Sequence, residues 1–145
     1  MLKLVAVGCT AMYAGASVYI SLVQHPSLLL MTDYRMQAIF FADMYDAAGR
    51  VMAPLSVLGS GAALTVWLIN RSELMWLAGG LCMASILPYT TYYMLRLNAT
   101  LRDPRRALRR GPTWLHQRLQ QWGRHHAVRS FLSLTATSTM LFGLR

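Results

Sequence analysis

The sequence predicts an all-α integral membrane protein in which four helices form a bundle. The chain has 145 residues and is 55% hydrophobic but only 13% charged, whereas about 25% of the residues of a soluble domain are charged. The apolar residues gather in four segments, each close to the ~20 residues that a helix needs to cross a bilayer. We therefore expect one transmembrane domain over residues 1–145, with helices near 2–24, 51–70, 74–97 and 113–144.

The first expected helix, near residues 2–24, carries one charge, at Lys3. Its apolar stretch is longer than that of a signal peptide and no clear cleavage site follows, so we expect a retained helix. Pro26 lacks an amide hydrogen and is expected to end or kink the helix, which leaves His25 at the break.

Residues 27–50 mix apolar side chains with five charged ones, at Asp33, Arg35, Asp43, Asp46 and Arg50. Such a segment is too polar to cross a membrane. The sequence predicts that it lies along the membrane interface as a partly helical segment with its aromatic rings among the headgroups.

The second expected helix begins at Val51 and has Pro54 in its first turn or two, where proline is tolerated. The third, Leu74–Leu95, carries no charge, and Pro88 is expected to kink it. A long basic loop should follow. The fourth helix should start at Pro112 and continue into an apolar half whose single charge is Arg129.

Positive charge is concentrated at one end of the predicted bundle. Nine of the arginines and a single acid lie between Arg96 and Arg129, and the net charge is +9. Basic loops mark the cytoplasmic or matrix side, so both termini should face the opposite side, and a mitochondrial inner membrane is the predicted setting. Nucleic acid is not an expected partner, because no binding motif or aromatic interleaving accompanies the arginines.

The basic loop has two predicted uses besides fixing the topology. It binds anionic phospholipids, at roughly 1 kcal/mol per nearby basic residue, or it docks another membrane protein subunit. The residues expected to make these contacts are Arg102, Arg105, Arg106, Arg109 and Arg110.

Polar side chains that are far apart in the sequence should meet at the basic end. Trp122, His126 and Arg129 recur at helical spacing in "WGRHHAVRS", which places them on one helix face. With four antiparallel spans, His25 at the end of the first helix and Asn98 at the end of the third reach the same level.

Four motifs in this order, "GASVYISLVQHP", "MAPL", "PYTTYYMLRLNATL" and "WGRHHAVRS", resemble the anthrone oxygenase-like membrane proteins, long catalogued as a domain of unknown function. The chain departs from that family in one place, where Arg96-Leu97 precedes Asn98 instead of proline and threonine. The residues on recurrent family positions are His25, Pro26, Pro54, Pro88, Tyr89, Thr90, Asn98, Leu101, Trp122, His126 and Arg129.

Known members of that family are fungal enzymes that oxidise anthrones to anthraquinones without a metal or organic cofactor, so the resemblance implies neither here. Such an enzyme removes a proton from a ring carbon, and the anion then reacts with dioxygen. His126 or His25 suits the base, because an ordinary histidine pKa lies near neutral. Arg129 and Asn98 would stabilise the oxyanion. The side chains expected to bind the planar substrate are Trp122 and Tyr89.

The same residues also fit a structural role, which we take as the first hypothesis, with the oxygenase as the alternative. Arg129 would reach headgroups, Trp122 would anchor the helix at the interface, and Asn98 would cap a helix end. The protein would then be an accessory subunit of a larger membrane complex, such as a respiratory or ATP-synthase complex. Haem or metal held by the histidines is the weakest alternative, since His125 and His126 point about 100° apart on a helix.

Overall fold

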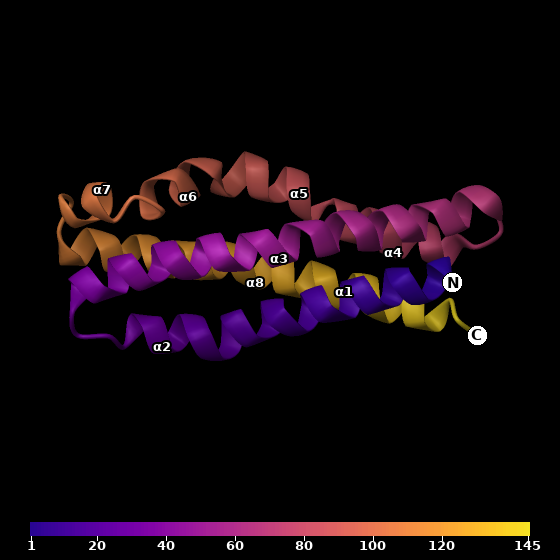
Figure 1. Cartoon of the computed structure of the whole chain (residues 1–145), viewed down its shortest axis with the longest axis horizontal. Coiled ribbons are helices and arrows are strands. Elements are labelled where there is room, and N and C mark those ends of the chain that lie inside the picture. The colour runs from indigo at the N-terminus through magenta and orange to yellow at the C-terminus, as the bar shows by residue number, and fades with distance from the viewer.

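The computed structural model describes all 145 residues, and almost all of them are helical, which confirms the all-α prediction. Four long helical stretches run side by side along one axis, and both chain termini lie at the same end (Figure 1). The first stretch consists of α1 (Leu2–Tyr19), the π-helix η1 (Ile20–Gln24) and α2 (His25–Leu29), and the second is α3 (Tyr34–Ile69). The third consists of α4 (Leu74–Ala84), α5 (Ile86–Tyr89), the π-helix η2 (Thr90–Met94) and α6 (Leu95–Leu101). The short α7 (Pro104–Leu108) then leads to the fourth stretch, α8 (Pro112–Phe142).

The four stretches pack in a ring, because α1 and α4 each lie against both α3 and α8. Three of them, Leu2–Leu29, Tyr34–Ile69 and Leu74–Leu101, are long and apolar enough to cross a membrane. Large apolar side chains are exposed on the outer faces, such as Leu22 at 72% and Phe131 at 69%. Soluble monomers rarely expose so much contiguous apolar surface, so the chain is a membrane protein.

The predicted interfacial segment is not separate from the second helix. Residues 34–50 form the first half of α3, a single helix of 36 residues. The Asp33 carboxylate caps its start by accepting hydrogen bonds from the amides of Arg35 and Met36, at 2.8 and 3.4 Å. Phe41 and Met44 on one face are buried in the bundle core. The prediction was wrong because that apolar face packs on protein rather than on headgroups, and Pro54 consequently lies in mid-helix.

The predicted basic loop is also largely helical. α6 continues the third stretch to Leu101, and α7 starts at Pro104 with the Asp103 carboxylate accepting a hydrogen bond from the Arg106 amide at 3.1 Å. Leu101 and Ala107 are buried in the core. Two buried apolar residues among the arginines are therefore enough to fold this segment back onto the bundle.

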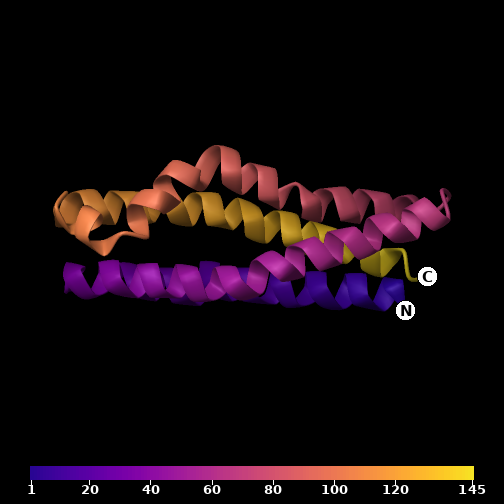
Figure 2. The same ribbon diagram turned by 45° about the horizontal axis from the view of Figure 1, so that its top comes forward.

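Pro26 lies next to a π-helix, and Pro88 lies between a helix break at Ser85 and a π-helix. η1 ends two residues before Pro26 and η2 starts two residues after Pro88. Proline removes one backbone hydrogen bond of a helix and a π turn shifts the bonds by one residue, so both disturb the regular α-helix at these two places. The third stretch bows away from its neighbours around α5 and α6, as expected of a kink at Pro88 (Figure 2).

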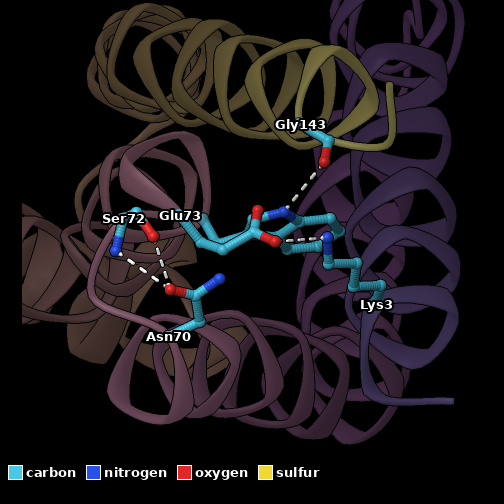
Figure 3. A network of polar contacts seen from close by, with 6 residues as sticks. Lys3, Asn70, Ser72, Glu73 and Gly143 are labelled. Atoms are coloured by element: carbon cyan, nitrogen blue, oxygen red, sulfur yellow. Dashed lines mark hydrogen bonds and ion pairs between the residues drawn. The ribbon is translucent and has the colours of Figure 1, made fainter.

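The end that holds the chain termini is joined by polar contacts between three segments (Figure 3). Lys3 Nζ forms an ion pair with Glu73 at 2.7 Å, and the Trp76 indole donates a hydrogen bond to the Gly143 carbonyl at 3.1 Å. The N-terminus, the α3–α4 turn and the end of α8 are thereby held together, while the basic segment lies at the far end.

Candidate functional site

A cavity of about 150 Å³ lies inside the bundle, part of the way towards the basic end. All four helical stretches contribute to its wall. Most of the wall is apolar, and it includes one residue of each π-helix, Ile20 and Thr90, in keeping with the frequent occurrence of π turns at functional sites. Its polar side chains are Tyr13, Tyr45, Ser56, Thr90, His126 and Arg129, with Trp122 beside them.

α8 presents Trp122, His126 and Arg129 to this cavity, as their spacing predicted. Trp122 and His126 are four residues apart, and their rings stack with centroids 4.7 Å apart and an interplanar angle of 28°. Arg129 follows one turn later. Both rings are buried, so this side of the cavity is a rigid aromatic wall next to the positive charge of Arg129.

The His126 ring is held from behind by three serines. Its Nδ1 lies 3.0 Å from Ser21 Oγ, which in turn lies 2.8 Å from Ser130 Oγ. Ser130 reaches the Ser17 hydroxyl at 2.9 Å and the Ser17 carbonyl at 3.0 Å. No protein group bonds to Nε2 of His126, so one ring nitrogen is anchored and the other stays free.

Arg129 has no carboxylate partner. Its Nε and Nη2 donate to the Tyr13 hydroxyl at 3.3 and 2.8 Å. The ion pairs of the chain involve Lys3, Arg102 and Arg106 instead. A half-buried guanidinium that contacts only a neutral hydroxyl keeps the capacity to bind an anionic group in the cavity.

Ser56 of α3 supplies an unused hydroxyl. The residue is 1% exposed and its Oγ has no hydrogen-bond partner in the chain, the one such side-chain atom in the structure. It lines the same cavity as Arg129. Buried hydroxyls are nearly always paired, so an unpaired one at a cavity wall points to a partner that occupies the cavity.

The cavity opens between α3 and α5. Gly49 and Ala53 on α3 and Leu87 on α5 line it and are exposed on the outer surface. α3 packs on α4, α6 and α7 but has almost no backbone contact with α5. The outward bow of the third stretch therefore leaves a lateral mouth on an apolar face.

His25 and Asn98 lie behind the cavity wall rather than in it. Asn98 Oδ1 accepts a hydrogen bond from the Trp122 indole at 3.1 Å, and His25 Nε2 donates to the Leu119 carbonyl at 2.8 Å. The rings of His25 and Trp122 are 5.5 Å apart. The two polar residues thus position Trp122, and neither is placed to act on a molecule in the cavity.

Gly123 permits this arrangement. A Cβ at that position would lie 2.2 Å from Cε1 of His25 and 2.7 Å from its Nδ1. Only glycine lets the imidazole approach the backbone of α8 so closely.

The sequence profile of the anthrone oxygenase family matches residues 41–139, more than half of the chain. The chain belongs to the anthrone oxygenase family. A search of curated proteins and of solved structures found no match. The matched region includes Ser56, Trp122, His126 and Arg129, while Tyr13, Ser17 and Ser21 lie outside it.

Other residues singled out in the sequence lie away from the cavity. The Tyr89 hydroxyl is 2.9 Å from His125 Nδ1 on the outer side of α8, so Tyr89 does not reach the cavity wall. No three His, Cys, Asp or Glu side chains lie together as metal ligands would. Each of the four histidines has a different hydrogen-bond partner, which for His116 is Gln120 at 3.1 Å.

The arginines expected to bind lipid or protein have different surroundings. Arg102 pairs with Asp46 at 2.7 Å and Arg106 lies 3.7 Å from Asp103, whereas Arg105 and Arg109 are exposed without an ion pair. Arg110 lines a surface groove together with Arg96 and Arg118.

Sequence reasoning missed half of the polar cavity wall. Tyr13, Tyr45 and Ser56 carry no motif, and their convergence depends on packing. The serines behind His126 did leave a signal, because Ser17 and Ser21 precede His25 at spacings of four and so share its helix face.

Proposed function

We propose that this member of the anthrone oxygenase family is a cofactor-independent oxygenase that acts on a planar, anthrone-like aromatic substrate. The observation that carries the proposal is the cavity lined by both His126, whose Nε2 has no hydrogen-bond partner, and Arg129, which has no carboxylate partner. A purely structural lock of helix ends would fill that space with side chains.

The serine chain suits a general base. With Nδ1–H of His126 donating to Ser21, Ser21 to Ser130 and Ser130 to the Ser17 carbonyl, each donor in the chain has an acceptor and Nε2 keeps a free lone pair. Nε2 then takes a proton from the ring carbon, and the resulting enolate oxygen is held by Arg129 and the Tyr13 hydroxyl.

The oxidation balances without an added reductant. The carbanion form of the enolate gives its electrons to dioxygen, and a carbon–oxygen bond forms at the deprotonated ring carbon. The peroxide then loses water as the second hydrogen leaves that carbon, which becomes a ketone. One oxygen atom stays in the quinone product and the other leaves as water.

The size of the cavity limits how the substrate binds. A cavity of about 150 Å³ holds a molecule of about the size of benzene. A three-ring substrate would therefore place one outer ring in the cavity, keep the central ring with its reacting carbon and carbonyl between His126 and Arg129, and extend the third ring through the mouth near Ala53. Entry from the bilayer suits an apolar, planar molecule.

The proposed setting is a multi-pass membrane protein whose basic end faces the cytoplasm or matrix and whose termini face the opposite side. The apolar second half of α8, with Phe131 and Leu141 exposed, would be the fourth span. A mitochondrial inner membrane, anionic phospholipid partners and a place among other membrane subunits stay predictions. A single chain offers no contact that favours the accessory role over the enzyme.

The test is oxygen-dependent conversion of anthrone to anthraquinone by the purified protein in neutral detergent, followed by absorbance. We expect His126→Gln to lower the rate by 10²- to 10⁴-fold, the usual range for a general base. His125→Gln is the matched control, because its ring faces Tyr89 outside the cavity. Equal rates for both variants, or the absence of activity in the wild type, would contradict the proposed oxygenase function.

A further inference from the structure

A second hollow, separate from the cavity, lies on the surface at the basic end. It is a groove of about 410 Å³, within the size range of ligand pockets. Three arginines reach it from different segments: Arg96 from α6, Arg110 from the turn after α7, and Arg118 from α8. Tyr93 and Trp114 add aromatic rings to its wall.

The charge of this groove is not neutralised by the protein. None of the three arginines forms an ion pair, and the ion pairs of the chain use Glu73, Asp46 and Asp103 elsewhere. Arg118 instead donates to the Gln121 side chain at 2.6 Å and lies over the Trp114 ring. Three guanidinium groups directed at one hollow without a carboxylate fit a phosphate, which arginine binds through paired N–H donors.

A second groove adjoins the first along the third stretch. Arg96 lines both, and the others that line the second are Pro88, Thr91 and Tyr92. Tyr92 is 84% exposed, and this stretch is apolar and long enough to cross a membrane. A ligand that fills both grooves has a phosphate at one end and an apolar tail that runs towards the bilayer core.

We infer that the Arg96–Arg110–Arg118 groove, which we call the arginine groove, binds the headgroup of an anionic phospholipid, with an acyl chain along Tyr92 and Pro88. Exposed tyrosines beside it suit the headgroup level, where aromatic side chains gather. This inference concerns a surface outside the cavity and does not depend on the proposed oxygenase activity.

The experiment titrates phosphatidylglycerol and phosphatidylcholine into the protein in neutral detergent, with bound lipid counted by native mass spectrometry. The wild type should retain one phosphatidylglycerol much more tightly than phosphatidylcholine. The variant Arg96→Gln/Arg110→Gln/Arg118→Gln should bind phosphatidylglycerol about 100-fold more weakly, since each basic residue near a headgroup changes affinity about fivefold.

The matched control is Arg105→Gln/Arg109→Gln/Arg124→Gln, which removes the same charge from exposed arginines outside the groove. We expect it to retain most of the affinity. An equal loss in both triple variants would mean diffuse attraction and would overturn the inference. Displacement of the lipid by an equal concentration of inorganic phosphate or of an acidic peptide would overturn it too, because the acyl chain would then contribute nothing.

Discussion

At the scale of single residues, the polar atoms without partners distinguish a binding cavity from a packed core. Ser56 and Arg129 line one cavity, and each lacks the partner that its chemistry calls for. The polar groups around them are satisfied: Ser60, one turn further along α3, donates to the Ser56 carbonyl at 2.7 Å. The one buried side-chain hydroxyl without a hydrogen-bond partner, that of Ser56, therefore lies on the wall where a ligand would lie.

Ser56→Ala tests this difference. Removing a buried, unpaired hydroxyl should leave the thermal stability unchanged or raise the free energy of unfolding by ~1 kcal/mol. If a substrate oxygen uses that hydroxyl, anthrone turnover should show a several-fold higher KM. Ser60→Ala serves as the control for KM, since its side chain does not line the cavity. An unchanged KM in Ser56→Ala would contradict a polar contact there.

Gly123→Ala should destabilise the protein by roughly 1–3 kcal/mol, the usual cost of overpacking. The new methyl group would collide with the His25 ring and displace it from the Leu119 carbonyl. Thermal unfolding in detergent measures the effect. Gly15→Ala is the control, because a Cβ there meets open space; similar unfolding temperatures for both variants would refute the close contact.

At the scale of elements, local signals marked the start of the fourth helix and the proline sites but not the helix lengths. α8 begins at Pro112 as expected, and the third stretch is interrupted at Ser85, one turn before Pro88, and bows beyond that point. The sequence still predicted an interfacial segment over 27–50, because charged residues interrupt its apolar pattern. Whether such an amphipathic stretch lies on headgroups or continues a helix depends on an apolar partner surface, which α2, α7 and α8 supply.

The gap between α3 and α5 should control access to the cavity. Ala53→Trp would place an indole in the lateral mouth and should lower kcat/KM for anthrone by tenfold or more. Ala47→Trp, on the same helix but outside the cavity wall, should have little effect. The rates of the two variants are compared in the same anthrone turnover assay. Equal activity of the two variants would mean that the substrate enters elsewhere.

At the scale of the whole molecule, charge asymmetry and helix order together predict a membrane topology, and cysteine labelling can test it. Single cysteines at Ser72 and at Arg105, in a chain with Cys9→Ser and Cys82→Ser, should react with a membrane-impermeant thiol reagent from opposite sides. We expect Arg105→Cys to react from the cytoplasmic or matrix side. Reaction of both positions from the same side would mean that the third stretch, Leu74–Leu101, does not cross the membrane.

The sequence by itself determined the helical membrane class, the polarity of the two ends and the shared face of Trp122, His126 and Arg129, because each depends on composition or on the 3.6-residue period. Only the tertiary structure decided which polar residues meet. It brought Tyr13 and Ser56 to the cavity and put Asn98 and His25 behind Trp122. Such contacts depend on how helices rotate and bow against one another, and no local pattern in the chain encodes that.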